Sequence, residues 1–284
     1  MLTRDDLRVM ACPVCHNALR FIGDRRGGRL RDGIVRCRGC SRDWSVEDGV
    51  VHMVQDDLVT GMDRILRPIY DLIAPVHDLG VDLLLPVLQF PDFGASRDHY
   101  IERLDLDQLV EPAEPRPLRI LEIGVGAGAN LSLIEAAVPS PLDVELWGVD
   151  LSPGMLAQCR RNLERSPVQS GVRLLLADAH ALPFPDATFD RVLHVGAING
   201  YRDRRRALAE MARVARPGTP IVVVDEELDP RRSHALYHRL AFFALTVYDA
   251  NPHAPEAELP LGAIDVQTSA VSRFYYCLRF AMPA

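Results

Sequence analysis

The chain contains no lysine. All 32 of its basic residues are arginines, and 39 acidic residues give the 284-residue chain a formal net charge of −7. Proteins that bind nucleic acid usually carry a basic surface that neutralises phosphates, so this balance disfavours a nucleic-acid partner. Only residues 1–55 reverse the sign, with ten arginines against seven acidic residues.

A long hydrophobic run is also missing. The longest apolar stretch, Val81 to Phe90, is interrupted by Pro86 and falls short of the roughly 20 residues that a membrane-spanning helix needs. The first residues, Met1 to Asp6, lack the apolar core of a secretory signal. We therefore expect no membrane span and a cytoplasmic location, where cysteine pairs bind metal more often than they form disulfides.

Four of the six cysteines form two matched pairs. Cys12 and Cys15 enclose Pro-Val, Cys37 and Cys40 enclose Arg-Gly, and 21 residues separate the pairs. Two such turns supply the tetrahedral four-sulfur site that suits Zn²⁺ better than iron. Because four protein ligands leave the ion no open position, the sequence predicts a structural zinc ribbon over residues 1–55.

Beyond the ribbon the pattern changes twice. Residues 56–115 are helical in pattern and end in a stretch rich in acid and proline, which predicts a helical cap and linker. Over residues 116–284, apolar runs alternate with amphipathic segments, as in βαβ units around a parallel sheet. We predict an α/β fold with a doubly wound, Rossmann-like sheet of seven strands, capped by helices from 56–115 and 231–260.

The strongest motif joins a strand to a helix. Leu121 to Asn130 reads Leu-Glu-Ile-Gly-Val-Gly-Ala-Gly-Ala-Asn, and its glycines allow a sharp turn and close approach of the backbone to a ligand. The next apolar run ends about twenty residues on at Asp150, where a carboxylate can accept ribose hydroxyls. The spacing Gly-x-Gly-x-Gly differs from the dinucleotide fingerprint, which disfavours NAD.

These pieces resemble the class I S-adenosylmethionine-dependent methyltransferases, in the branch of the ubiquinone and menaquinone C-methyltransferases. The glycine loop, Asp150, the run from Ala181 to Asp190 and the turn from Arg213 to Gly218 follow in the order of that family. Ile69 to Ala74 is similar to the helix that precedes the fold there. The resemblance covers about residues 60–225.

The resemblance also implies which residues bind S-adenosylmethionine. Glu122 would order the glycine loop and the methionine amine, Asp150 would bind the ribose, and Asp178 would lie at the adenine edge. The full set of implied cofactor-binding residues is Glu122, Gly124, Gly126, Gly128, Asn130, Asp150, Leu151, Met155, Asp178, Ala179 and Val195.

His194, near the end of the fourth predicted strand, is the candidate catalytic residue. Its ordinary pKa of about 6.5 suits a general base, but a ring that is hydrogen-bonded in the core is an equal alternative. Methyl transfer depends mainly on positioning donor and acceptor, so it does not require a base. The later cap segment carries an apolar stripe that is more typical of core packing than of a substrate wall. The stripe comprises Leu236, Tyr237, Leu240, Phe243 and Val247.

The sequence thus predicts methyl transfer from S-adenosylmethionine to a small organic acceptor. The alternative is methylation of an rRNA base, because Leu7 to Val51 resembles the zinc ribbon of a bacterial rRNA guanine-N1 methyltransferase. A scaffold that only binds the cofactor is a third class, which the intact glycine loop and Asp150 disfavour. The arginines at the hairpin tip of the ribbon (Arg25, Arg26, Arg29 and Arg31) suit a solvated hairpin or a contact to the cap or to a second subunit, so a homodimer stays open.

Overall fold

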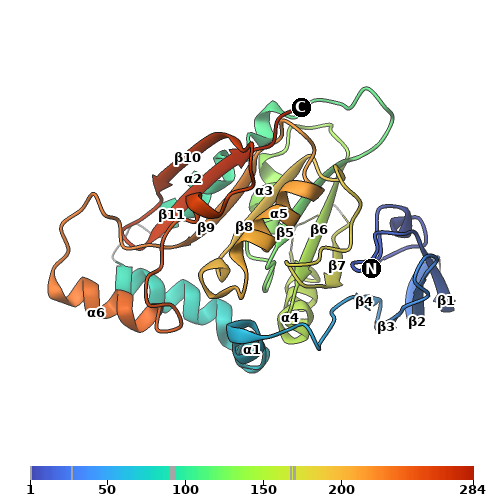
Figure 1. Cartoon of the computed structure of the whole chain (residues 1–284), viewed down its shortest axis with the longest axis horizontal. Helices are drawn as coiled ribbons and strands as arrows, with labels where there is room; N and C mark the ends of the chain where they lie inside the picture. Colours follow the sequence, from blue (N-terminus) through green and yellow to red (C-terminus); the bar gives the residue numbers. More distant parts are fainter. Residues whose placement is uncertain (1, 27, 90–93, 167, 169–170) are drawn as a thin grey trace.

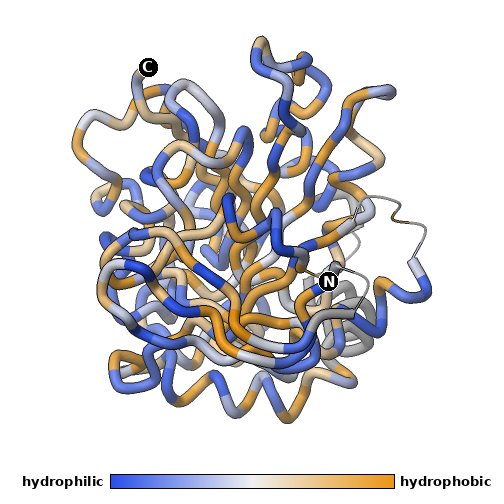
Figure 2. The backbone as a smooth tube through the Cα atoms, turned by 90° about the vertical axis from the view of Figure 1, so that its right-hand side faces the viewer, coloured by the Kyte–Doolittle hydropathy of each residue, from blue (hydrophilic) through white to orange (hydrophobic). Residues whose placement is uncertain are grey.

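One sheet of eleven strands runs through the molecule, in the order β1-β2-β3-β4-β7-β6-β5-β8-β9-β11-β10 (Figure 1). The computed structural model describes all residues except 1, 27, 90–93, 167 and 169–170, and leaves the side chains of 25–26, 77–89 and 94–96 undescribed. Hydrophobic segments gather in the interior of the molecule, and hydrophilic segments lie mostly at its periphery (Figure 2).

Seven of these strands form the doubly wound sheet that the sequence predicts. Strands β5 to β9 are mutually parallel, whereas β11 runs antiparallel to both β9 and β10. Their bounds are β5 Leu118–Ile123, β6 Val144–Asp150, β7 Arg173–Leu176, β8 Arg191–Val195, β9 Ile221–Glu226, β10 Ile264–Ala270 and β11 Tyr275–Ala281. Alternate residues of β5 enter separate core clusters, with Leu121 and Ile123 on one face and Leu118 and Ile120 on the other, so apolar packing covers both faces.

The predicted count of seven strands is too low, because the ribbon adds four more to the same sheet. They are β1 Leu19–Arg26, β2 Arg29–Cys37, β3 Asp43–Glu47 and β4 Val50–His52. β4 pairs in parallel with β7, where Val51 lies opposite Leu175. A pairing between strands more than a hundred residues apart leaves no periodic signal in the sequence, so the pattern could not reveal it.

Packing is also continuous across the predicted boundary at residue 55. Ribbon residues such as Leu7 and Trp44 belong to the same buried cluster as Trp147 of β6 and Phe184, which lies between β7 and β8. The backbone N–H of Ala11 donates to the carbonyl of Pro183 at 2.9 Å. The hydrophobic core therefore joins the ribbon to the rest of the sheet. The domain boundaries at residues 55 and 115 stay a prediction.

Helices connect the parallel strands and cap one end of the sheet. The helix α4 begins where the Ser152 hydroxyl accepts a hydrogen bond from the N–H of Met155 at 3.0 Å, with Pro153 at the first helical position. The bounds are α1 Gly61–Gln89, α2 Gly94–Glu102, α3 Leu131–Ala137, α4 Pro153–Leu163, α5 Arg204–Val214 and α6 Leu236–Leu245, with short 3₁₀ turns at Asp6–Arg8, Leu106–Gln108, Ile198–Gly200 and Glu256–Glu258.

The apolar stripe of α6 is not part of the core, contrary to the expectation from sequence. The five side chains of the stripe are 55–74% exposed. The residues that α6 buries are His238 and Phe242, on its opposite face. Along the helices of the described part of the chain, no segment is both long and apolar enough to cross a membrane.

Candidate active site

A cavity of about 290 Å³ lies at the carboxyl ends of the parallel strands. The last residues of four strands line it: Ile123 of β5, Asp150 of β6, Val195 of β8 and Glu226 of β9. The inner face of α1 covers it with Leu66, Arg67 and Tyr70. Ligands of open α/β sheets bind at this edge, so the cavity is the candidate site.

Ten of the eleven predicted cofactor residues line this cavity: Glu122, Gly124, Gly126, Asn130, Asp150, Leu151, Met155, Asp178, Ala179 and Val195. The exception, Gly128, has a φ of +84°, and a Cβ there would lie 2.8 Å from the sulfur of Cys159 on α4. In this structure the missing side chain of Gly128 lets the loop pack against α4.

Glu122 is a buried carboxylate held on one side only. Tyr100 donates a hydrogen bond to the Oδ1 atom of Asn130 at 2.7 Å, and the Asn130 amide donates to the Oε1 atom of Glu122, also at 2.7 Å. The Oε2 atom of Glu122 is buried and has no hydrogen-bond partner among the described residues. Burial raises the pKa of Glu122 to about 8. The carboxyl is thus ready for a cationic donor that enters the cavity.

Asp150 ties the glycine loop to the start of α4. One carboxylate oxygen accepts the N–H of Gly126 and the other accepts the N–H of Ser152, each at 2.8 Å. Burial raises the pKa of Asp150. Because each carboxylate oxygen has two lone pairs, Asp150 can still accept hydroxyl groups from the cavity side.

Asp178 links the site to the cap through Arg202. Its carboxylate accepts hydrogen bonds from the backbone N–H of His180 at 2.9 Å and from Arg202, and Arg202 also donates to Asp63 of α1 at 2.7 Å. Burial opposes the charge, but hydrogen bonds from His180 and Arg202 outweigh it and lower the pKa of Asp178 to about 2. Arg202 could not be predicted from the sequence, because a single arginine after a turn has no distinctive pattern.

A second contact fixes α1 over the site. The Asp71 carboxylate accepts the Ser152 hydroxyl at 2.5 Å and the N–H of Gly154 at 2.9 Å. A Cβ on Gly154 would lie 2.8 Å from the Cα atom of Asp71, so only glycine permits this close approach. Asp71 belongs to the stretch Ile69 to Ala74 that the sequence analysis singled out.

His194 lies beneath the glycine loop and does not line the cavity. Its Nδ1 atom is 2.8 Å from the carbonyl oxygen of Ile123, and its ring packs against Tyr201, which does line the cavity. The side chain is fully buried, and burial lowers the pKa of His194 to about 4. This geometry matches the alternative of a core histidine, while its role as a general base stays a prediction.

Sequence reasoning missed the far end of the cavity, where Glu226 ends β9. Its carboxylate accepts the hydroxyl of Tyr248 at 2.5 Å and that of Tyr275 at 3.4 Å. Tyr70 of α1 lines the cavity as well, and the charge of Glu226, after burial itself, raises the pKa of Tyr70. The strand-end rule that found Asp150 would have found Glu226 too, since both acids close an apolar strand.

The four predicted metal-binding cysteines come together at the ribbon. All four sulfurs lie within 4.8 Å of one another, with Cys12 and Cys40 3.8 Å apart and Cys15 and Cys37 3.4 Å apart. Tetrahedral zinc with Zn–S bonds of about 2.3 Å requires sulfur–sulfur distances near 3.8 Å. The sulfurs therefore fit such an ion, and the backbone N–H groups of Gly39 and Cys40 point at the sulfur of Cys37.

The fold and this cavity together define a class I S-adenosylmethionine-dependent methyltransferase. A family model described as a methyltransferase domain matches residues 121–223. The chain is 36% identical over 170 residues to the demethylmenaquinone methyltransferase of Thermus thermophilus. These 170 residues cover 60% of this chain and 70% of that relative. The chain belongs to this methyltransferase family, as its resemblance to the quinone branch predicts.

One further relative matches over a smaller share of its length, whereas two solved structures match over most of theirs. The ubiquinone/menaquinone biosynthesis C-methyltransferase UbiE of Geobacter sulfurreducens is 36% identical over 129 residues, which is 45% of this chain and 49% of that relative. A putative S-adenosylmethionine-dependent methyltransferase from Methanococcus maripaludis has a TM-score of 0.51 at 14% identity, over 75% of this chain and 94% of that one. The [4+2]-cyclase SpnF also reaches 0.51 at 16% identity, over 79% and 97%. At such identities the structures show the shared fold alone.

Proposed function

We propose that this protein transfers a methyl group from S-adenosylmethionine to a small organic acceptor held in the same cavity. One observation supports this most: Glu122 and Asp150, at the ends of neighbouring strands, face one cavity on either side of the glycine loop. The buried Oε2 atom of Glu122 would accept the methionine ammonium, and Asp150 would accept the ribose hydroxyls. Bound there, the cofactor would supply an electrophilic methyl group.

The acceptor in this proposal is an apolar molecule with a hydrogen-bond donor such as a ring hydroxyl. Val224 and Val271 line the cavity together with Glu226. A hydroxyl of the acceptor could donate a hydrogen bond to Glu226. Relatives named as demethylmenaquinone and ubiquinone/menaquinone methyltransferases support a quinol-like acceptor over RNA.

Calorimetry with S-adenosylhomocysteine tests the cofactor site. We expect the wild type to bind and Asp150→Ala to lose roughly 1.5–3 kcal/mol of binding, or about 10- to 150-fold in Kd. Asp143→Ala is the matched control, because Asp143 is exposed just before the other end of the same strand. The proposal fails if the wild type does not bind S-adenosylhomocysteine or binds NAD more tightly.

The ribbon in this proposal holds one structural Zn²⁺ through Cys12, Cys15, Cys37 and Cys40. When bound, the ion would cross-link the two turns and perform no step of the reaction. Because thiolate ligands need reducing conditions, the proposed compartment is the cytoplasm. The ribbon would act as part of the fold and not as an RNA-binding module, since its Arg36 is already paired with Asp43 by two hydrogen bonds of 2.6 Å.

A further inference from the structure

The outer face of α1 exposes a row of apolar side chains. Ile65, Ile69, Leu72 and Val76 recur at helical spacing and are 47–82% exposed. The inner face of the same helix carries Leu66 and Tyr70, which line the cavity. An amphipathic helix normally turns its apolar side inward. Over its described turns, α1 is apolar on both sides.

The helix α6 repeats this feature with the stripe that the sequence assigned to the core. Leu240 and Phe243 are 59% and 69% exposed, while His238 and Phe242 point into the protein. The two helices lie along the same edge of the molecule, α1 in cyan and α6 in orange (Figure 1). Leu66 of α1 and Tyr248, just beyond α6, both lie against Gly200. We call the exposed apolar side chains of α1 and α6 the cap face.

The number of exposed apolar side chains sets the cap face apart from ordinary surface. Single exposed apolar residues are normal, but a row of them on each of two helices at one edge of the molecule marks an interaction site. The face combines aliphatic residues with the aromatic rings of Tyr237 and Phe243. Helices that lie in a membrane interface present such a mixture.

Among the described side chains of these two helices, the exposed charge is positive. Residues 230–248 contain no acidic residue, and Arg231 and Arg239 are exposed there. On α1, Arg64 is exposed, whereas Asp63 is buried against Arg202. The second acid of the described part of α1, Asp71, is bound to Ser152 and Gly154. An apolar face with basic flanks therefore stands on a chain of net charge −7.

From the cap face and its arginines we infer that the protein docks on a membrane surface containing anionic lipid. A second copy of the chain is a poorer partner, because a two-fold interface places each face against its own equivalent. The arginines would then meet a face that offers no exposed acid from the described residues of α1 or α6 to neutralise them. Anionic headgroups supply that missing charge, and the acyl boundary accepts the apolar side chains.

Docking through the cap face would also bring the cavity close to the membrane. The side chains that line the cavity and those of the cap face alternate along one helix, as Leu66 follows Ile65 and Tyr70 follows Ile69. Only the thickness of α1 would separate the bound lipid from the cavity. The inference concerns where the protein binds and is independent of which acceptor it methylates.

Flotation with lipid vesicles tests this inference on the full chain. We expect wild type to float with vesicles of phosphatidylcholine and phosphatidylglycerol, and to bind at least tenfold more weakly to phosphatidylcholine alone. The double variant Leu72→Glu/Phe243→Glu should lose binding to both. Val110→Glu is the matched control, because Val110 is as exposed as these residues but belongs to the segment before β5, outside both helices. Arg239→Gln should weaken binding to the anionic vesicles about fivefold.

Thermal unfolding shows whether the double variant still folds. We expect its unfolding midpoint to stay close to that of wild type, because both substituted positions are exposed. A milder variant, Leu72→Ser/Phe243→Ser, should also weaken binding to both kinds of vesicle, but less than the double glutamate variant does. Wild type that stays with the unbound fraction at every lipid composition overturns the inference. A second outcome would overturn it too: wild type is a dimer in sedimentation equilibrium and does not bind vesicles, and the double variant is a monomer. Binding of S-adenosylhomocysteine is measured separately, so failure of the cofactor site would not be mistaken for failure to dock.

Discussion

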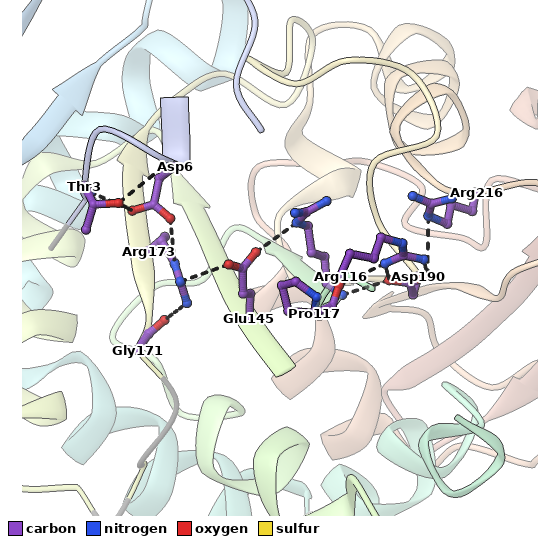
Figure 3. A network of polar contacts seen from close by, with 10 residues as sticks. Thr3, Asp6, Arg116, Pro117, Glu145, Gly171, Arg173, Asp190 and Arg216 are labelled. Carbon is purple, nitrogen blue, oxygen red and sulfur yellow. Dashed lines mark hydrogen bonds and ion pairs between the residues drawn. The ribbon is translucent and has the colours of Figure 1, made fainter. Parts of the chain in front are cut away.

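The carboxylate of Asp6, in the ribbon, lies 3.1 Å from the Nε atom of Arg173 on β7. Arg173 also contacts Glu145 on β6 at 3.1 Å, and Glu145 contacts Arg119 on β5 at 2.8 Å (Figure 3). A row of alternating charges thus runs from the ribbon across three strands of the sheet. The ribbon is held by buried charge as well as by apolar packing.

Breaking the first link of this row should destabilise the protein. Asp6 is buried and also accepts hydrogen bonds from the N–H and hydroxyl of Thr3, so Asp6→Asn should cost about 1–2 kcal/mol in the free energy of unfolding. Denaturant titration measures it. Asp5→Asn is the control, because Asp5 and Arg8 form an exposed pair at 3.7 Å and its loss should cost under about 0.5 kcal/mol. Equal effects would mean that the buried pair contributes no more than the exposed one.

Cofactor affinity should depend on pH through Glu122. Below its pKa of about 8 this carboxyl is protonated in the empty protein, and a bound ammonium group favours the ionised form, so binding expels a proton. Affinity for S-adenosylhomocysteine should rise as pH increases toward 8, by up to about tenfold per pH unit. Calorimetry in buffers of different ionisation enthalpy would detect the released proton. Glu122→Gln should bind weakly and without this pH dependence.

The same carboxyl should weaken the fold as pH rises. A pKa raised from 4.5 to about 8 on folding means that the native state holds a proton that the unfolded chain has released between these values. Stability therefore falls from pH 4.5 to pH 8, and Glu122→Gln should be more stable than wild type, most clearly at pH 8. Denaturation midpoints of both proteins at pH 5 and pH 8 test the sign. A variant that is less stable at pH 8 would contradict it.

Glu226 should affect turnover without affecting the cofactor. Replacing Glu226 by Gln keeps the shape but exchanges one carboxyl oxygen, which could accept a hydroxyl of the acceptor, for an amide nitrogen that cannot. We expect the rate to fall by about 10²-fold or more if Glu226 takes a proton, with Kd for S-adenosylhomocysteine within about twofold of wild type. Tyr248→Phe, which removes one hydrogen bond to Glu226, should have a smaller effect. An unchanged rate in Glu226→Gln would exclude it from the acceptor end.

Metal analysis should find one zinc ion per chain. Cys37→Ser removes the sulfur that receives two backbone N–H groups, and should lose the ion and lower the stability of the ribbon. Cys159→Ala is the control, since Cys159 lies in α4, outside the cluster. Freshly reduced protein without zinc or iron would contradict the proposed site.

RNA binding should be weak and independent of the ribbon tip. Substituting Arg25, Arg26, Arg29 and Arg31 by alanine would remove the basic cluster at the tip of the ribbon. Filter binding with total RNA at low and moderate salt should change little. Tight binding that depends on these arginines would instead favour RNA methylation. Together with Arg36 and Arg38 they would make six phosphate contacts, for which the log–log salt slope is on the order of −4.

The sequence was most informative where one strand end carries a distinctive residue. Asp150 and the glycine loop could be placed in advance, because parallel strands bring their carboxyl ends to one edge of the sheet. The partners of these residues were not predictable. Arg202 reaches Asp178 through the tertiary fold, and Asp71 reaches α4 from a helix about eighty residues earlier. Neither contact has a local signature.

The exposed stripe of α6 shows a different limit. Apolar residues at helical spacing reveal that a helix has an apolar face, but not what covers it. In α6 the buried face is the narrower one of His238 and Phe242, and the broader apolar face lies outside. Hydrophobic pattern alone cannot distinguish a core from a surface that meets another molecule.

The pairing of β4 with β7 has a consequence for the sheet as a whole. Without the ribbon, β7 would be an open edge, and its Leu174 to Leu176 backbone could recruit a strand from another molecule. With the ribbon in place, the outermost strand is β1, whose pairing slips between Gly23 and Arg25. An irregular, arginine-rich edge is a poor template for growth. A shortened chain that begins at β5 should therefore be prone to aggregation. In the full chain, the ribbon protects this edge of the sheet by covering β7.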